Sequence, residues 1–247
     1  MRLDVAFAPA LLADPERKVC VLIDVLRATS SLATMFARGL GEALVAGTVE
    51  QARALRAERP GYLLCGEERG LAPAGFDYGN SPVEFDGLDL RGRRAIVATT
   101  NGTRALSIAA ACRAVYTGAL VNASAAARAA AREARDAGLD LVLLCAGNGG
   151  GRLFSLEDAY CAGALVDALE REDSGLELWS SAKAALRLYR SYDGSAEAAF
   201  RESDTAAPLI EKRLGDDVAF CAQRDLFDVA PRLVRADGRT LRLRAGA

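Results

Sequence analysis

Apolar runs alternate with helix-patterned segments along most of the chain. Runs rich in Val, Ile and Leu that end in Gly or polar residues predict short buried strands, and apolar positions at helical spacing predict the helices between them. Cap residues such as Thr48, and Asn122 or Ser124, mark the starts of expected helices. The predicted strands are residues 19–24, 42–47, 62–67, 94–100, 114–121 and 139–147. The predicted helices are residues 26–39, 48–61, 106–110, 122–138 and 155–170.

This alternation is typical of an α/β protein. We expect a three-layer α/β/α arrangement with a mainly parallel, mixed sheet, because strands that are apolar on both faces need helices on both sides. The chain is long enough for one domain over residues 1–247, with a division into two sub-lobes left open. Residues 68–92, rich in Gly, Pro and Asp, predict a long loop. Beyond about residue 175 the pattern predicts helices at 181–192 and 207–215 and a hairpin at 232–244, around Asp237-Gly238.

Composition narrows the classes of function. The 247 residues are 51% hydrophobic and carry a net charge of −2, which excludes the basic face of a nucleic-acid-binding protein. No apolar run is long enough to span a bilayer. The N-terminal residues, interrupted by Asp4, Pro9 and Asp14, do not resemble a secretion signal. We therefore expect a cytoplasmic protein without nucleic-acid or membrane partners, and leave a homo-oligomer open.

The chain contains no histidine, which restricts its chemistry. Ser-His-Asp and Cys-His catalysis, phosphohistidine intermediates and most zinc sites are thereby excluded. Carboxylates, hydroxyls, Lys, Arg, Cys or a hard cation held by oxygen ligands remain. The six cysteines lie far apart without a C-x-x-C pair, and we expect them to be reduced thiols in the core.

Asp24 follows the first predicted strand, within the segment DVLRATSS. Ligands of open α/β sheets bind beyond the carboxyl ends of the strands. A buried aspartate at such a place costs free energy unless it is paired or holds a metal ion. Asp24 is therefore a candidate functional carboxylate, with Arg27 beside it. The alternative is an Asp24–Arg27 ion pair next to an ordinary helix cap.

The stretch TTNGTRAL, residues 99–106, stands where a strand ends and a helix begins. Thr100 or Asn101 can cap the helix, and Gly102 lets backbone N–H groups approach a ligand closely. The positive end of a helix dipole attracts anions, Thr103 adds a hydroxyl group, and Arg104 adds a bidentate cation. We expect these residues to cradle an anion, most simply phosphate. A well-capped helix with a surface arginine is the alternative.

Glu157 and Asp158 stand at the start of another predicted helix, after the glycine run at residues 149–151. They are candidate metal ligands. The alternative is that both acids stabilise the positive end of the helix dipole, with a capping box between Ser155 and Asp158.

Three common motifs of phosphatases and nucleotide-binding proteins do not fit the sequence. The spacing from Cys145 to Arg152 exceeds the C-x5-R loop of cysteine phosphatases by one residue, and no histidine precedes it. Leu26 stands where the D-x-D-x-T loop of haloacid-dehalogenase phosphatases has its second aspartate. The chain has no Walker A lysine motif.

Five segments in order resemble the 2-phosphosulfolactate phosphatase (ComB) family. They are IDVLRATSS, GFDYGNSP, TTNGTRAL, AGNGGGRLFSLEDAYCAG and DVAFCAQRDLFDVAPRL, and they extend from about Asp24 to Leu233. Any one segment is a weak signal, whereas their order and spacing are specific. The resemblance implies a three-layer α/β/α fold and a Mg²⁺-dependent hydrolysis of 2-phospho-3-sulfolactate to 3-sulfolactate and phosphate, a step of coenzyme M biosynthesis.

The resemblance also suggests roles for individual residues. Asp24, Glu67 and Asp158 are the expected Mg²⁺ ligands, and Asp24, Glu67 and Arg27 are the expected catalytic residues. We expect attack by a water molecule with help from a carboxylate base, and an aspartyl-phosphate on Asp24 is the rival mechanism. The expected substrate-binding residues are Thr100, Asn101, Gly102, Thr103, Arg104, Arg69, Asn80 and Ser81.

Two other functions stay open at this point. The same phosphatase chemistry could serve another small phosphorylated carboxylic acid, since fold and family do not fix the substrate. A module that binds a phosphate metabolite without turning it over is the other candidate. The acids expected around Asp24 argue against such a module, because carboxylates repel a phosphate unless a metal ion intervenes.

Overall fold

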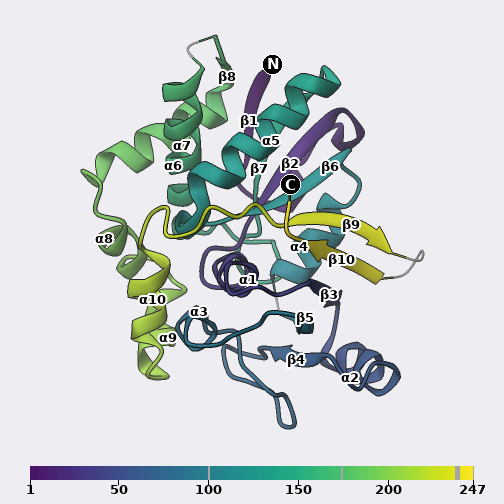
Figure 1. Cartoon of the computed structure of the whole chain (residues 1–247). Coiled ribbons are helices and arrows are strands. Elements are labelled where there is room, and N and C mark those ends of the chain that lie inside the picture. Colours follow the sequence, from purple (N-terminus) through teal and green to yellow (C-terminus); the bar gives the residue numbers. More distant parts are fainter. Residues whose placement is uncertain (100, 174, 237–239, 247) are drawn as a thin grey trace.

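The computed structural model describes residues 1–99, 101–173, 175–236 and 240–246. These residues form a 10-stranded sheet with helices packed on both of its faces (Figure 1). The strands are β1 (Arg2–Ala6), β2 (Lys18–Ile23), β3 (Glu42–Ala46), β4 (Leu63–Gly66), β5 (Arg94–Ala98), β6 (Ala114–Gly118), β7 (Asp140–Cys145), β8 (Glu177–Leu178), β9 (Arg232–Ala236) and β10 (Thr240–Arg244).

Helices connect most of these strands in the way the apolar spacing predicts. Three short 3-10 helices are η1 (Pro9–Leu11), η2 (Pro15–Arg17) and η3 (Leu120–Asn122). The α-helices are α1 (Ala28–Ala37), α2 (Val49–Glu58), α3 (Pro82–Asp86), α4 (Gly102–Ala109), α5 (Ala123–Ala137), α6 (Leu156–Glu172), α7 (Ser180–Ser191), α8 (Ala196–Arg201), α9 (Ala206–Glu211) and α10 (Gly215–Cys221).

The sheet consists of two parallel blocks joined by a C-terminal hairpin. Its strand order is β4-β5-β3-β10-β9-β6-β2-β7-β1-β8. Strands β4, β5 and β3 are mutually parallel, as are β6, β2, β7, β1 and β8. The hairpin β9–β10 is antiparallel to β3 on one side and to β6 on the other, so the two blocks run in opposite senses. The expected mixed, mainly parallel α/β sheet is confirmed.

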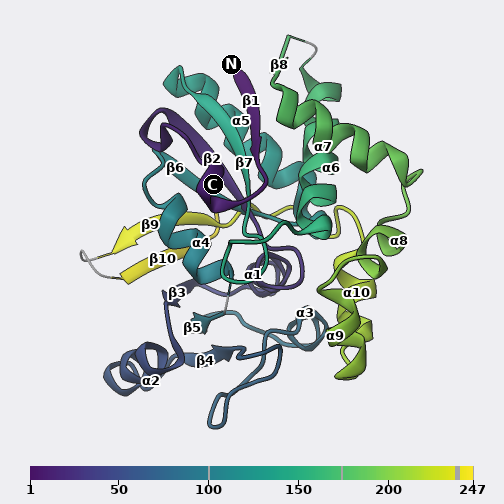
Figure 2. The ribbon, with the colours of Figure 1, turned by 180° about the vertical axis from the view of Figure 1, so that it is seen from behind.

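The two blocks do not lie side by side in one plane. In Figures 1 and 2, β3, β5 and β4 lie beyond the ends of β2 and β7 rather than alongside them. The chain segments that leave β2, β4, β5 and β7 therefore converge in the middle of the molecule. This convergence places the polar residues that follow each of these strands close together.

Both faces of the central strands are buried. Val21 and Ile23 of β2 pack in a cluster with α5 and α6, while Cys20 and Leu22 pack in a second cluster with α1 and α4. Helix α5 lies over one face in Figure 1, and α4 lies over the other face in Figure 2. Alternate side chains of a strand point to opposite faces, so this burial explains the continuous apolar runs of the sequence. The six cysteines are buried free thiols, as expected.

Strand β1 is not predicted by the apolar pattern, because Asp4 interrupts its short apolar sequence. The structure places β1 between β7 and β8. Lys18 Nζ lies 3.2 Å from one Asp4 carboxylate oxygen, and the Ser181 hydroxyl donates to the other at 2.6 Å. These partners compensate the cost of a partly buried charge inside a strand.

Two segments differ from their predicted secondary structure: one predicted loop contains a helix, and one predicted helix is divided into two. The predicted loop at 68–92 contains helix α3, which Ser81 caps by accepting from the Glu84 N–H, so the expectation of an unbroken loop is wrong. The prediction of a single helix over residues 207–215 is also wrong. Helix α9 ends at Glu211, Arg213 has a φ of 64°, and α10 begins at Gly215.

The start of α5 also differs from the expected cap. The Asn122 carboxamide accepts from the Ala119 N–H and donates to the carbonyl oxygens of Thr117 and Val229. It therefore fixes the preceding turn instead of capping the helix. The hairpin at 232–244 is confirmed, whereas its expected turn, Asp237-Gly238, lies outside the described residues. None of the helices in the described part of the chain is both long and apolar enough to cross a membrane.

Gly163 allows α6 and α7 to pack closely. A Cβ atom at this position would lie 2.1 Å from the Ala185 carbonyl oxygen and 2.7 Å from the Tyr189 Cβ. We expect Gly163→Ala to lower the free energy of unfolding by roughly 1–3 kcal/mol, because the two backbones must separate. Urea denaturation measures the change. Gly61→Ala is the matched control, since no atom lies within 4 Å of its added methyl group. Equal stabilities of the two variants would contradict the packing argument.

Candidate active site

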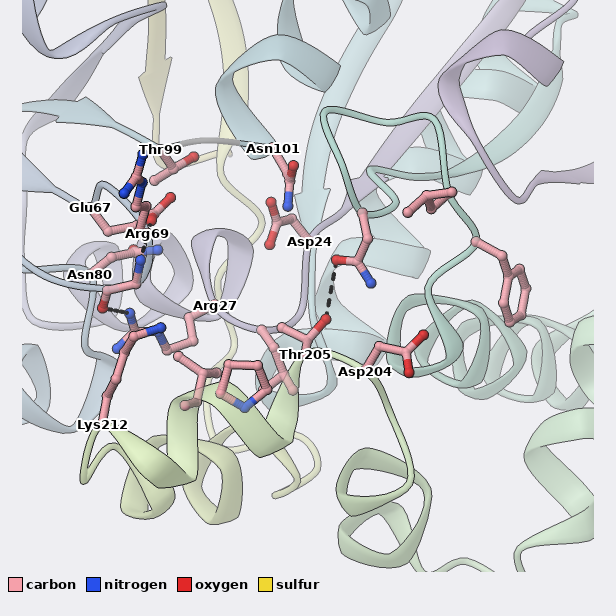
Figure 3. A pocket seen from close by; sticks show the side chains of 17 residues that line it. Asp24, Arg27, Glu67, Arg69, Asn80, Thr99, Asn101, Asp204, Thr205 and Lys212 are labelled. Atoms are coloured by element: carbon pink, nitrogen blue, oxygen red, sulfur yellow. Dashed lines mark hydrogen bonds between the residues drawn. The ribbon is translucent and has the colours of Figure 1, made fainter.

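The segments that follow β2, β4, β5 and β7 enclose a cavity of about 360 Å³ together with residues around α9 (Figure 3). A volume of this order suits a small organic ligand. Polar and charged side chains dominate the wall after β4, α9 itself contributes the apolar Pro208 and Leu209, and the segment after β7 contributes Asn148, Leu153 and Phe154. The lining residues used below are Asp24, Arg27, Glu67, Arg69, Gly70, Asn80, Thr99, Asn101, Asn148, Phe154, Asp204, Thr205 and Lys212.

Asp24 lies at the inner end of the cavity, directly after β2. The residue is 7% exposed, and one carboxylate oxygen accepts weakly from the Ala28 N–H at 3.4 Å. The Asp24 N–H donates to the Thr29 hydroxyl at 3.1 Å, and the Asp24 carbonyl accepts from the Thr29 N–H. The start of α1 thus fixes the backbone of Asp24 and leaves most of its carboxyl group to the cavity.

Burial and neighbouring acids raise the pKa of Asp24 from 3.8 to about 7. Burial is the largest cause of the raised pKa. The hydrogen bond from the Ala28 N–H opposes it, the charges of Glu67 and Glu157 then raise the pKa further, and the charge of Arg27 lowers it. The pKa of Asp158 is also raised well above its ordinary value, first by burial and then by the charges of Glu157 and Asp24. The inner end of the cavity is therefore short of positive charge.

Arg27 lines the cavity, but its charge is largely compensated. The guanidinium donates to the Asp217 carboxylate at 2.5 Å and to the Gly70 carbonyl at 2.8 Å. The Arg27 and Asp217 side chains are 3% and 2% exposed, and the Ser81 hydroxyl donates to the second Asp217 oxygen at 2.5 Å. The alternative of an Asp24–Arg27 ion pair is not what the structure shows. Arg27 instead connects the β2 end to α10.

The TTNGTRAL stretch lies against Asp24. A Cβ atom on Gly102 would lie 2.8 Å from an Asp24 carboxylate oxygen and 2.8 Å from the Ala28 Cβ, so only glycine fits there. Thr99 and Asn101 line the cavity, and the Asn101 side chain accepts from the Gly150 N–H at 3.0 Å. The cap of α4 comes from Thr99, whose hydroxyl lies 3.3 Å from the Thr103 N–H, and not from Asn101. Thr100 lies outside the described residues.

Several predicted residues are not on the cavity wall. The Thr103 hydroxyl is buried and donates to the Thr99 carbonyl at 2.5 Å. Arg104 is exposed on α4, and its guanidinium lies beside Gly150. Ser81 binds Asp217 and caps α3, as described above. By contrast, Glu67, Arg69 and Asn80 all line the cavity, in agreement with the convergence expected from strand-end loops.

Glu157 and Asp158 are buried at the start of α6, behind the cavity wall. The Asp158 carboxylate accepts from the Val25 N–H at 2.9 Å and from the Gly147 N–H at 3.1 Å. It therefore joins the β2 and β7 ends and does not complete a capping box, although the Ser155 hydroxyl accepts from the Asp158 N–H. One Glu157 oxygen is buried without a hydrogen-bond partner in the described part of the chain.

The donor set suits a hard cation. Among the described residues, no three acids or cysteines lie close enough to form a complete metal cage. Asp24 and Glu67 nevertheless bring two carboxylates to one cavity, and Glu157 and Asp158 add negative charge behind them. Mg²⁺ commonly binds one or two carboxylates and keeps several waters or phosphate oxygens. The residues present therefore fit a magnesium ion in the cavity.

Sequence reasoning missed the contribution of the C-terminal helices. Asp204, Thr205 and Lys212 line the cavity, and the Thr205 hydroxyl bonds to the Asn148 side chain at 3.1 Å (Figure 3). Asp217 anchors Arg27 from α10. These residues follow no strand, so the rule that pointed to the other loops could not find them.

The sequence is similar to a family of phosphatases over nearly its whole length. The profile of the family described as 2-phosphosulpholactate phosphatase matches residues 8–236. A protein from Thermotoga petrophila named "Probable 2-phosphosulfolactate phosphatase" is 36% identical over 94% of this chain and 95% of its own. Proteins of the same name from Carboxydothermus hydrogenoformans and Deinococcus radiodurans are 36% and 39% identical, over 97% and 89% of this chain and 96% and 89% of their own.

The raised pKa of Asp24 makes stability depend on pH. Between about pH 4 and pH 7 the folded protein keeps a proton on Asp24 that the unfolded chain has lost, so the free energy of unfolding falls as pH rises through this range. Asp24→Asn removes this decrease in the free energy of unfolding, because an amide does not titrate in this range. We expect the variant to match the natural protein near pH 4 and to exceed it by roughly 2–4 kcal/mol above pH 7. Urea denaturation in EDTA buffer at several pH values measures the difference. A difference that does not change with pH would contradict the buried, protonated state.

Proposed function

The chain belongs to the 2-phosphosulfolactate phosphatase family, and from this premise we propose that it hydrolyses 2-phospho-3-sulfolactate to 3-sulfolactate and phosphate. We further propose that the reaction requires Mg²⁺ and serves coenzyme M biosynthesis. The observation that supports the activity best is the convergence of Asp24, Glu67 and the start of α4 on one small cavity. Phosphoryl transfer needs little more from a protein than positioning and charge neutralisation.

The phosphate group of the substrate is best placed at the inner end of the cavity. Gly102 allows the first turn of α4 to pack against Asp24, so α4 directs its N-terminal, positive end toward this part of the cavity. Thr99 and Asn101 add polar side chains to the wall there. Arg27 retains N–H donors beyond the two that bind Asp217 and Gly70, since a guanidinium carries five.

Mg²⁺ would be held by the carboxylates of Asp24 and Glu67. When bound, it supplies neutralisation of the phosphate charge and polarisation of the phosphorus–oxygen bond. Without a cation, the negative charges of these acids would repel the negative charge of the phosphate. Asp158 contributes by fixing the Val25 and Gly147 backbone, because both of its oxygens already accept N–H bonds.

We favour direct attack by water over attack by a side chain. Asp24 or Glu67 would accept the proton that the water loses, and the alkoxide of 3-sulfolactate would leave with the electrons of the cleaved P–O bond. The rival is attack by an Asp24 carboxylate oxygen, which forms an aspartyl-phosphate that water then hydrolyses.

Two alternatives share the same cavity. Another small phosphorylated carboxylic acid could be the substrate, and a panel of such esters in a phosphate-release assay distinguishes it. A non-catalytic binding module would bind these esters without releasing phosphate. The pair of acids at the inner end of the cavity speaks against a module, because a site built only for anion binding gains nothing from them.

Removal of the Asp24 charge should abolish metal-dependent turnover. We expect Asp24→Asn to lower kcat for 2-phospho-3-sulfolactate at least roughly 100-fold, because an amide neither holds Mg²⁺ well nor accepts a proton. Phosphate release with added Mg²⁺, and again with EDTA, measures the effect. Asp193→Asn is the matched control, an exposed aspartate outside the cavity. Full activity of Asp24→Asn, or turnover of the natural protein that EDTA does not reduce, would refute the proposed metal site.

Rapid quench distinguishes the two mechanisms. Under direct water attack, we expect no acid-stable phosphoprotein during turnover of ³²P-labelled substrate, and 3-sulfolactate and phosphate are released together, without a burst of 3-sulfolactate. Mass spectrometry of quenched peptides containing Asp24 gives a second measurement. A labelled Asp24 peptide that forms and decays at the rate of turnover would establish the aspartyl-phosphate instead.

A further inference from the structure

The cavity has a cationic wall that the proposed phosphate site does not use. Arg69 and Lys212 both line it, and Figure 3 shows them on the same side of the cavity as Glu67 and Arg27. They come from the loop after β4 and from the end of α9, which are far apart in the sequence. The fold thus brings two positive side chains together at a place where neither segment alone would form a site.

Neither cation is compensated by the part of the chain that the structure describes. Arg27, the other cation of the wall, is paired with buried Asp217. The Arg69 and Lys212 side chains have no hydrogen-bond or ion-pair partner among the residues that the structure describes. Both are exposed at the mouth of the cavity, so their charges are available to a ligand.

The backbone beside Arg69 is held in a fixed conformation. Glu67 accepts from the Gly70 N–H at 2.7 Å, and the Gly70 carbonyl accepts from Arg27 at 2.8 Å. Arg69 itself has a φ of 55°, a left-handed conformation that costs a non-glycine residue free energy. Lys212 packs over the same turn, with its Nζ 3.8 Å from the position of a Cβ atom on Gly70. The backbone that carries Arg69 is therefore fixed by Glu67 and Arg27, and Lys212 lies against the same turn.

The opposite side of the mouth is unsuited to anions. Asp204 carries a negative charge there, and it lies on the other side of Thr205 from Lys212 in Figure 3. Phe154 adds an apolar surface that is 53% exposed. An anionic group outside the phosphate site is consequently directed toward Arg69 and Lys212.

We infer that Arg69 and Lys212 form a specificity pair that binds two further anionic groups of the substrate, its carboxylate and its sulfonate. The inference rests on the proposed function, since it takes the phosphate to occupy the inner end with Asp24 and Glu67. It defines the substrate class as a phosphate monoester that carries two additional negative charges close to the ester carbon. Esters that lack those charges bind the inner site alone.

Three esters with the same carbon skeleton test this pair. 2-Phospho-3-sulfolactate carries both additional anionic groups, 2-phosphoglycerate has a hydroxyl in place of the sulfonate, and glycerol 2-phosphate lacks both anionic groups. The kcat/KM of each is measured for the natural protein, Lys212→Met and Arg69→Gln. Arg213→Gln is the matched control, because Arg213 follows Lys212 and is exposed outside the cavity.

The effect of each substitution should depend on the substrate. We expect Lys212→Met and Arg69→Gln each to lower kcat/KM for 2-phospho-3-sulfolactate roughly 10- to 100-fold, mainly through KM. Glycerol 2-phosphate should change less than about 3-fold, because it makes no contact with the pair. Equal losses on all three esters, or no loss on any, would overturn the inference.

A binding measurement separates this inference from the proposed reaction. 3-Sulfolactate retains both anionic groups and lacks the phosphate, so calorimetric titration of it reports on the pair without turnover. We expect binding to the natural protein and to Arg213→Gln, with at least a roughly 10-fold weaker affinity for Lys212→Met. If no ester is hydrolysed but this pattern holds, the proposed function alone fails. If the ester is hydrolysed but 3-sulfolactate binds all variants equally, or none, the specificity pair is refuted.

Discussion

Burial of Asp24 among other carboxylates is the constraint on which the centre of the molecule depends. The charges of Glu67 and Glu157 raise the pKa of Asp24, and those of Glu157 and Asp24 raise the pKa of Asp158. The guanidinium of Arg27 is already paired with Asp217. A fold that concentrates carboxylates in this way gives up stability at its centre, because burial and mutual repulsion disfavour their charged forms. Under the proposed function, a metal ion held between these acids would remove the repulsion that they exert on a phosphate ester.

The protein meets this constraint with backbone groups more than with side chains. Both Asp158 oxygens are satisfied by N–H groups at the ends of β2 and β7, and Glu67 is fixed by the Gly70 N–H. Arg27 binds the Gly70 carbonyl, and Asn101 binds the Gly150 N–H. Each strand-end loop is thereby tied to another one. The positions of the acids are set by these ties, so ligand binding requires little reordering of the chain.

Local sequence signals pointed to some of the residues that line the cavity at strand ends. Asp24, Glu67 and Asn101 follow apolar runs, and the prediction that such positions meet is correct even though the two blocks of the sheet run in opposite senses. Sequence position does not reveal the direction of a side chain, which is why Ser81 and Arg104 were expected at the wall and lie elsewhere. No local sequence pattern identifies Lys212 or Asp217. Lys212 lies against Gly70 and Asp217 binds Arg27, and both partners are far away in the sequence.

The place of the C-terminal hairpin has a consequence for how the chain folds. Strands β9 and β10 follow all the other strands in the sequence, yet they join the two parallel blocks, with Leu241 beside Val45. Pairings between residues so far apart in the sequence form slowly, because closing so long a loop costs conformational entropy. Until the hairpin docks, β3 and β6 each present an unpaired sheet edge, and such edges are where folding chains pair with one another.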